Sequence, residues 1–159
     1  MAALKIGVIS DTHGLLRPEA MAALHGSDWI IHAGDIGNPE ILSSLRSIAP
    51  LSAVRGNVDR GDGVRNLPAT QAVEVGGFGL YVLHILDDLD LDPAAAGFQA
   101  VIHGHSHQPS IRYVKDILYL NPGSAGPRRF RLPVTLARIL IDGTAQHAEI
   151  IHLLPDAME

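Results

Sequence analysis

The chain has 159 residues, of which 47% are hydrophobic and 18% charged, and its net charge is −5. These values exclude an intrinsically disordered chain, and the length suits one domain, so we expect residues 1–159 to form a single domain. With no cysteine, the chain has no thiolate zinc site, cysteine nucleophile or disulfide. The low aromatic content (4%) and acidic balance exclude general nucleic-acid binding. The short apolar stretch Met1–Ile9, interrupted by Lys5, predicts neither a signal peptide nor a membrane span, and hence a cytoplasmic protein with no membrane partner.

The first half of the chain alternates apolar runs with helical stretches. Short runs rich in β-branched residues predict buried strands at Leu4–Ile9, Trp29–His32 and Leu51–Val54. A helix is predicted at Pro18–Leu24, which has proline in its first turn. A second helix is predicted from the cap residue Asn38 to about Ile48. This β-α-β-α-β order is typical of a parallel sheet.

The second half contains more strands than helices. Apolar runs predict strands at Ala69–Val75, Leu80–His84, Ala100–His103, Ile111–Val114, Ile117–Leu120, Val134–Ile141 and Ala145–Leu153. Three pairs of these runs flank the turn residues Gly76-Gly77, Lys115-Asp116 and Asp142-Gly143, as β-hairpins do. One short helix is predicted at Pro93–Ala96. The predicted fold class is therefore α/β, with a parallel first half and a mostly antiparallel second half.

Polar side chains follow five of these strands, at or just after the point where each strand ends. They are Asp11, His13, Asp35, Asn57, His84, His105 and His107. Because strands that run in one direction deliver their carboxyl ends to one edge of a sheet, we expect these side chains to converge. One Asp-x-His or Gly-Asp pair alone is ordinary turn chemistry. Five such groups in series, each at a strand end, indicate a metal site.

The residue types indicate which metals this site would bind. Imidazole and carboxylate groups with one amide and no sulfur favour Mn²⁺, Fe²⁺, Co²⁺, Ni²⁺ or Zn²⁺ over calcium or magnesium. Seven candidate ligands are too many for one tetrahedral ion that keeps an open position, whereas two ions sharing a carboxylate account for the number. Paired ions about 3.5–4 Å apart are typical of phosphoester hydrolysis. Their charge would also attract an anionic phosphate to an acidic chain.

The same residues resemble, in chain order, the motifs of the calcineurin-like metallophosphoesterases. The motifs are Asp11-x-His13, Gly34-Asp35, Gly56-Asn57-x-Asp59, His84 and Gly104-His105-x-His107. The similarity spans about residues 4–107 and continues at Asn121-Pro122-Gly123-Ser124, which with the short length resembles the small prokaryotic phosphodiesterase branch. That branch is similar to the eukaryotic retromer subunit that keeps the fold as a protein-binding scaffold. The resemblance implies a β-sandwich of mixed sheets flanked by helices.

The resemblance also implies a ligand set for each of two divalent ions. The first ion would be held by Asp11, His13, Asp35 and His107. The second would be held by Asp35, Asn57, His84 and His105, so that Asp35 bridges the two. Asp35, Asn57 and His105 are the residues assigned to catalysis. Mn²⁺ is the expected ion, with Ni²⁺, Fe²⁺, Co²⁺ and Zn²⁺ as alternatives.

The activity implied is hydrolysis of a small phosphodiester by a hydroxide shared between the ions, which attacks phosphorus in line with the leaving oxygen. The alternative is a non-catalytic metal-binding scaffold on the same fold. A scaffold is free to lose ligands, yet all seven positions here hold metal-binding residue types. A third possibility, a metal-assisted amide hydrolase, is disfavoured by the pattern of a bridging aspartate with an asparagine.

Two positions depart from the family pattern. Many members have a histidine, the proposed general acid, where this chain has Val58, although the small prokaryotic branch commonly lacks it as well. The valine puts the handling of poor leaving groups in question. The histidine of the fourth motif is usually followed by glycine, but here His84 is followed by Ile85. The mouth of the site should therefore differ at this point.

Other polar residues have both a structural and a functional interpretation. His32 and His103 are interpreted as core histidines in preference to supports for ligands, and Asp59 as a carboxylate that could orient a ligand imidazole. Asn121–Ser124 is interpreted as a structural turn near the metals, and the acidic run Asp87–Asp92 as a solvated loop. Contacts with substrate phosphate are left open for Arg55, Arg128, Arg129 and Arg131. The remaining histidines His25, His147 and His152 are expected at the surface, and the apolar run Ile150–Leu154 is a candidate surface for a homo-oligomer.

Overall fold

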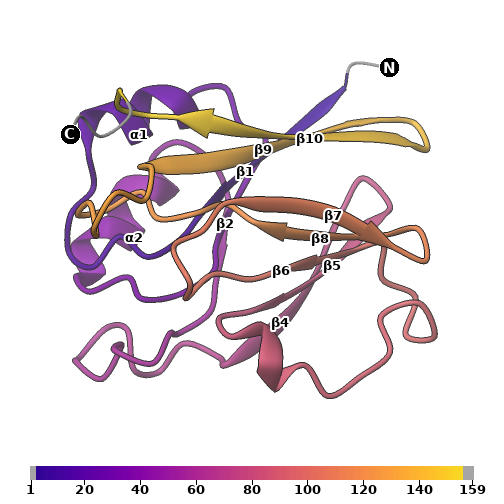
Figure 1. Ribbon diagram of the computed structural model, residues 1–159, viewed down its shortest axis with the longest axis horizontal. Coiled ribbons are helices and arrows are strands. Elements are labelled where there is room, and N and C mark those ends of the chain that lie inside the picture. Colours follow the sequence, from indigo (N-terminus) through magenta and orange to yellow (C-terminus); the bar gives the residue numbers. More distant parts are fainter. Residues whose placement is uncertain (1–2, 156–159) are drawn as a thin grey trace.

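A computed structural model describes residues 3–155, which form two mixed five-stranded sheets (Figure 1). The first sheet has the order β10-β9-β1-β2-β3, with β1 at Leu4–Ile9, β2 at Trp29–His32, β3 at Leu51–Ala53, β9 at Thr135–Asp142 and β10 at Ala145–His152. The second has the order β4-β5-β6-β8-β7, with β4 at Thr70–Val75, β5 at Phe78–Leu83, β6 at Ala100–Ile102, β7 at Ser110–Val114 and β8 at Ile117–Asn121. The predicted β-sandwich of mixed sheets is confirmed.

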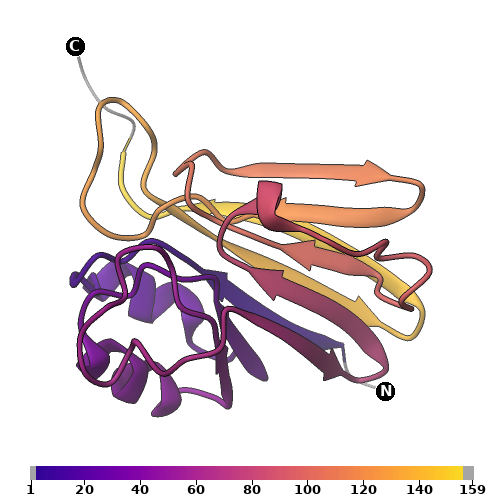
Figure 2. The ribbon, with the colours of Figure 1, turned by 90° about the horizontal axis from the view of Figure 1, so that it is seen from below.

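The first half of the chain forms the parallel part of the first sheet. Strand β1 pairs in parallel with β2, and β2 with β3, and the connections between them contain α1 (Pro18–Leu24) and α2 (Pro39–Arg46). Asn38 caps α2 as predicted, because its side-chain oxygen accepts a hydrogen bond from the Glu40 N–H at 3.0 Å. In Figure 2 both helices lie on the same side of the sandwich. There Ala20 and Leu24 join a core cluster with Ile30 of β2.

The second half contains the three predicted hairpins, β4-β5, β7-β8 and β9-β10, each antiparallel. The prediction of a mostly antiparallel second half misses the central strand β6, which pairs in parallel with both β5 and β8. Sheet order of this kind depends on pairings between distant segments, which local hydrophobic patterns do not encode. After β8 the chain returns to the first sheet, where β9 pairs antiparallel with β1, so the β9-β10 hairpin completes that sheet.

The helix predicted at Pro93–Ala96 is wrong, because this segment is a turn. The Asp92 side chain accepts a hydrogen bond from the Ala94 N–H at 3.1 Å, as in the first turn of a helix. Gly97 then adopts a φ of +88° and ends the turn before a helix can extend. A short 3₁₀ helix that the sequence analysis did not predict, η1, occurs instead at Leu86–Asp88.

The main core lies between the two sheets. Ile6, Val8 and Ile31 of the first sheet and Leu80 and Leu120 of the second are all within one buried cluster. Burial of such side chains from both sheets is the main source of stability for the fold. A smaller cluster on the outer face of the second sheet is covered by the loop that contains η1.

The carboxyl-terminal apolar run is used largely inside the molecule. Ile150 packs against the cluster between the sheets, and Ile151 and Leu153 pack against the cluster under the helices. Self-association through this segment stays a prediction. No helix within residues 3–155 has the length and apolar character needed to cross a membrane.

Candidate metal centre

The ends of the strands bring the predicted ligands together in two groups. Asp11, His13 and His107 form the first group, in which the ligand atoms lie within 4.8 Å of one another. Asp35, His84 and His105 form the second group at the same spacing. The residues come from the loops after β1 and β2 of the first sheet and after β5 and β6 of the second. They converge as predicted, but the strands that deliver them belong to two sheets and not to one.

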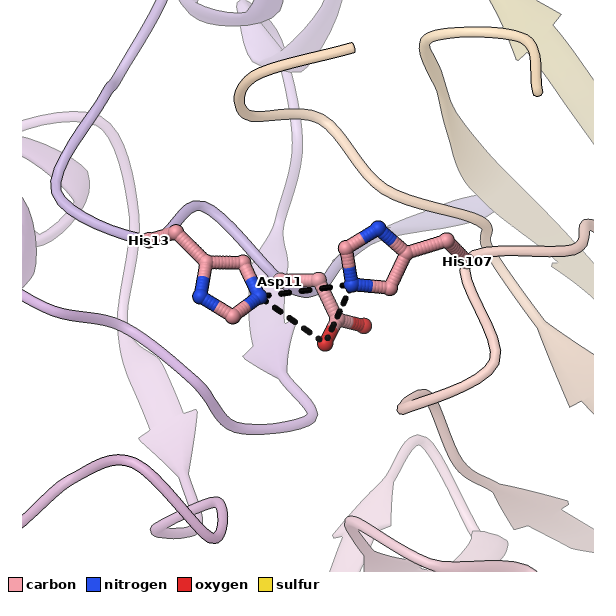
Figure 3. Close-up of side chains that lie close together, drawn as sticks. All are labelled: Asp11, His13 and His107. Carbon is pink, nitrogen blue, oxygen red and sulfur yellow. Dashed lines mark hydrogen bonds and ion pairs between the residues drawn. The ribbon is translucent and has the colours of Figure 1, made fainter. Parts of the chain in front are cut away.

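The first group is centred on the Asp11 carboxylate. Its Oδ1 atom lies 3.4 Å from His107 Nε2 and 3.7 Å from His13 Nε2, and the two imidazole nitrogens are 3.3 Å apart. Figure 3 shows the two rings on either side of the carboxylate, with their Nε2 atoms turned toward each other and toward Oδ1. Three atoms with lone pairs therefore face one small volume.

The second group lies against the first, and Asp35 contacts both. Its Oδ2 atom is 3.1 Å from His84 Nε2 and 3.6 Å from His13 Nε2 of the first group. Asn57 joins the second group through its side-chain oxygen, which lies 3.2 Å from His105 Nδ1. Asp35 therefore has the position expected of a shared ligand, between the two sets of imidazoles.

Buried polar atoms that make no hydrogen bond indicate that the side chains of the centre fit divalent cations. Among the described residues, Asp11 Oδ1 and His84 Nε2 are buried and have no hydrogen-bond partner. A buried polar atom without a partner costs about 1–3 kcal/mol, so such atoms are rare unless a ligand satisfies them. Two carboxylates, one amide oxygen and four imidazoles suit the borderline-hard divalent ions named above.

The carboxylates and imidazoles of the centre shift one another's pKa values. Burial raises the pKa of the Asp11 carboxyl, but the imidazoles of His107 and His13 outweigh that effect and hold the pKa well below its ordinary value. The pKa of Asp35 is also lowered, because His84 and the Val58 N–H outweigh the effect of burial. Burial lowers the pKa of His84, but Asp35 and Asp11 reverse this and raise it. Without metal, the carboxylates thus favour the protonated form of His84, and a divalent cation would compete with that proton.

Backbone strain is concentrated at the candidate ligands. Within residues 3–155, eight residues other than glycine have a positive φ, and five of them are Asp11, His13, Asp35, His105 and His107. Their φ values run from 45° to 73°, a left-handed conformation that costs energy for residues other than glycine. Such strain persists only where the surrounding structure enforces it, and it gathers at functional sites.

Two glycines of the motifs allow the ligand loops to approach each other closely. A Cβ atom at Gly56 would overlap the Asp35 carboxylate, and one at Gly104 would overlap the side chains of Ser10 and Asp11. Any larger residue at either position would displace a candidate ligand. The glycines that precede Asn57 and His105 thus allow the loops to meet.

Asp59 supports the centre in a different way from the one expected. It does not orient an imidazole; its buried carboxylate accepts hydrogen bonds from three backbone N–H groups. These belong to Ile36 (3.0 and 3.1 Å), Gly37 (3.1 Å) and Gly56 (2.8 Å). Asp59 therefore joins the loop that carries Asp35 to the loop that carries Asn57.

His32 is a core histidine, as interpreted, and it also joins two ligand loops. Its Nδ1 accepts a hydrogen bond from the Gly34 N–H at 3.1 Å, so Nε2 carries the proton and donates to Thr12 Oγ1 at 3.0 Å. Thr12 in turn donates to the Ile36 carbonyl at 2.9 Å. Complete burial lowers the pKa of His32 to about 4, which keeps this chain of hydrogen bonds neutral.

Four hydrogen bonds around the centre, three of which involve a serine hydroxyl, were not found from the sequence. Ser10 Oγ donates to Asp11 Oδ2 at 2.8 Å, and Ser124 Oγ donates to the Asp11 carbonyl at 2.9 Å. The Asn121 amide donates to the Gly104 carbonyl and to Ser106 Oγ, each at 3.1 Å. Asn121–Ser124 is thus a structural turn beside the ligands, as predicted. Nothing marks a serine hydroxyl in a sequence as a partner of a carboxylate, apart from its place next to a motif.

The remaining predicted residues lie at or beyond the edge of the centre. The Val58 side chain is 46% exposed, while its N–H donates to Asp35 Oδ1 at 3.0 Å. Arg55 borders the second group and donates to the Leu67 carbonyl at 2.6 Å. Arg128 donates to the Pro155 carbonyl, and Arg129 is exposed. Asp87, Asp88, Asp90 and Asp92 are exposed, as are His25, His147 and His152. His103 is buried.

Known proteins resemble this chain in sequence and in fold. The family model for the calcineurin-like phosphoesterase superfamily domain matches residues 4–144. A probable metallophosphoesterase of Methanothermobacter thermautotrophicus is 37% identical over 158 residues, which cover 92% of this chain and 91% of that protein.

Two solved structures resemble the fold over most of their length. A predicted phosphoesterase of Streptococcus pneumoniae has a TM-score of 0.73 and 26% identity, over 96% of this chain and 91% of its own. Vacuolar protein sorting 29 of Cryptosporidium parvum has a TM-score of 0.75 and 16% identity, over 95% of this chain and 98% of its own, and shows likeness of fold alone. From the match of residues 4–144 and the 37% identity to the Methanothermobacter protein, the chain belongs to the calcineurin-like phosphoesterase superfamily.

Proposed function

We propose that the protein is a phosphodiesterase that depends on two divalent metal ions. The observation that carries the proposal is the position of Asp35, whose Oδ2 atom lies 3.1 Å from His84 Nε2 in one group and 3.6 Å from His13 Nε2 in the other. Asp11 Oδ1 and His84 Nε2 support it, because both atoms are buried and make no hydrogen bond, and a bound cation would satisfy their lone pairs.

Each residue has a defined task in this proposal. Asp11, His13 and His107 hold one ion, Asn57, His84 and His105 hold the other, and Asp35 belongs to both. When bound, such a pair of ions supplies charge stabilisation for the phosphoryl oxygens and lowers the pKa of water to about 7. Asp35 is kept in place by the Val58 N–H, which occupies its second oxygen at 3.0 Å. The left-handed loops keep the imidazoles oriented before any substrate arrives.

The surroundings favour a diester over a monoester as substrate. Two cavities adjoin the second group, one lined by Asn57 and His84 and the other by His105. A phosphodiester has two substituents to place and one negative charge, whereas a monoester has one substituent and up to two charges. Among residues 3–155, Arg55 is the only basic residue other than histidine that lines either cavity.

The second candidate function is a metal-binding scaffold without catalysis. The likeness of fold to vacuolar protein sorting 29 favours it, and so do the exposed side chains of Ile111, Tyr113 and Val114 on the edge strand β7. A scaffold has no need of strained ligand loops or of a complete ligand set. Mn²⁺ as the bound ion, a cytoplasmic location and the absence of general nucleic-acid binding stay predictions.

Turnover of bis(p-nitrophenyl) phosphate by the purified protein tests the proposal. We expect no turnover after treatment with EDTA and recovery when Mn²⁺ is added. His107→Ala should abolish turnover, whereas His25→Ala, which changes an exposed histidine outside the centre, should keep it. Full activity after prolonged dialysis against chelator would refute metal dependence. Metal binding without turnover of any diester would favour the scaffold.

A further inference from the structure

Two cavities open beside the second group of ligands, and the Ile85 side chain lines both. One, of about 210 Å³, is bordered by Arg55, Asn57, Thr70, His84, Ile85 and Asp88, and we call it the Arg55 cavity. The other, of about 250 Å³, contains His103 and His105 in its wall. Since Ile85 follows His84 directly, it stands between the cavities at the mouth of the centre.

The Arg55 cavity has hydrogen-bonding groups of both kinds. Arg55 is held at its border by the hydrogen bond from Nη1 to the Leu67 carbonyl, and its other N–H groups are donors. Asp88 is an acceptor, and within residues 3–155 its carboxylate has no hydrogen bond or ion pair. Thr70 adds an exposed residue whose hydroxyl can both donate and accept.

Hydroxyl groups on a ligand would match the hydrogen-bond donors and acceptors that line the Arg55 cavity. An anionic substituent would gain from Arg55 but would meet the Asp88 carboxylate, and an apolar one would form a hydrogen bond with neither side chain. Hydroxyl groups offer a donor for Asp88 and an acceptor for Arg55. The volume of about 210 Å³ lies below the range of about 300–1,000 Å³ for sites that hold drug-sized ligands, so the substituent is small.

We propose that the Arg55 cavity binds a small polyhydroxylated substituent of the phosphodiester, with Asp88 as the residue that selects for hydroxyl groups. The inference rests on the proposed function, because it assumes that the phosphate lies at Asp35, His84 and Asn57. It adds the class of substrate, which is a diester that carries a polyol or sugar-sized group.

Binding of unreactive analogues tests the cavity without catalysis. We would use phosphinates, in which CH₂ replaces both ester oxygens, carrying either a 2,3-dihydroxypropyl arm or the matching propyl arm. Calorimetric titration of the metal-loaded protein should show about tenfold tighter binding of the dihydroxypropyl compound, because a hydrogen bond to a charged group contributes about that factor. Asp88→Ala should remove the preference while leaving the affinity for the propyl compound unchanged.

The matched control is Asp90→Ala, which removes the same charge from the same exposed loop but lies outside the cavity lining. This variant should keep the preference. Equal affinity of the parent for the two compounds, or a preference that survives in Asp88→Ala, would overturn the proposal. Turnover of bis(p-nitrophenyl) phosphate, measured in the same preparations, reports the proposed function separately. A protein that hydrolyses this ester but ignores the hydroxyl groups refutes the cavity assignment alone.

Discussion

Replacement of Asp59 by alanine should loosen the centre without touching any candidate ligand. The change removes the acceptor of three backbone N–H groups, of which that of Ile36 is buried. A hydrogen bond to a charged group contributes about 1.5–3 kcal/mol when buried, and the two partly buried bonds contribute about 0.5–1.5 kcal/mol each. These contributions add up to about 2.5–6 kcal/mol, so we expect a loss of at least about 3 kcal/mol in the free energy of unfolding. For a domain of this size each kcal/mol lowers Tm by about 2–4 °C, which gives a fall of at least about 6 °C.

The assay is thermal unfolding followed by circular dichroism in EDTA, so that metal does not mask the effect. Asp62→Ala is the control, since Asp62 is exposed and its surface ion pair with Arg65 contributes little. Because Asp59 joins the loops of Asp35 and Asn57, the variant should also bind metal about 10–100-fold more weakly. A Tm within about 2 °C of the parent, together with unchanged metal affinity, would refute the role assigned to this carboxylate.

Three further predictions concern pH, the leaving group and a glycine. Without metal, His84 stabilises the fold below its unfolded pKa of about 6.5 and loses this contribution as pH rises through its raised folded pKa. Tm in EDTA should therefore fall as pH rises above about 6.5, and Mn²⁺ should raise Tm more at alkaline than at acidic pH. A Tm in EDTA that does not change with pH would contradict the coupling. With Val58 in place of a proton donor, kcat/KM for a series of aryl and alkyl diesters should fall steeply as the leaving group becomes more basic, and Val58→His should selectively speed the alkyl esters by up to about 10²-fold. A flat dependence in the parent would reveal another donor. Gly56→Ala should abolish metal binding, because the new Cβ would overlap the Asp35 carboxylate, whereas Gly61→Ala, which faces open space, should bind metal as the parent does.

The strands, and the polar residues at their ends, could be predicted from the sequence because both depend on local patterns. A run such as Leu4–Ile9 is apolar enough to identify a buried strand, and Asp11 and His13 follow at a fixed distance. His84 was also placed correctly at the end of β5 despite the unusual Ile85 that follows it. Its Nε2 atom lies beside the Asp35 carboxylate.

The contacts that hold the centre together depend on tertiary structure and could not be predicted. Asp59 belongs to the motif Gly56-Asn57-x-Asp59, which suggested an imidazole as its partner, but its carboxylate accepts hydrogen bonds from the backbone N–H groups of residues 36 and 37. The parallel pairing of β6 on both sides depends on the order of distant strands. The turn at Pro93–Ala96 could not be distinguished from a helix in the sequence, because the left-handed conformation of Gly97 ends it.

The number of metal ions bound by the parent and by Asp35→Asn shows whether the centre holds two ions that share Asp35. Titration of metal-free protein with Mn²⁺, followed by calorimetry and by hydrolysis of bis(p-nitrophenyl) phosphate, should show about two ions per chain, with activity rising as they bind. Because Asp35 contacts both groups of imidazoles, Asp35→Asn should weaken both sites and lower turnover at least about a hundredfold. Binding of a single ion by the parent, or normal turnover and metal content in Asp35→Asn, would contradict the two-ion centre.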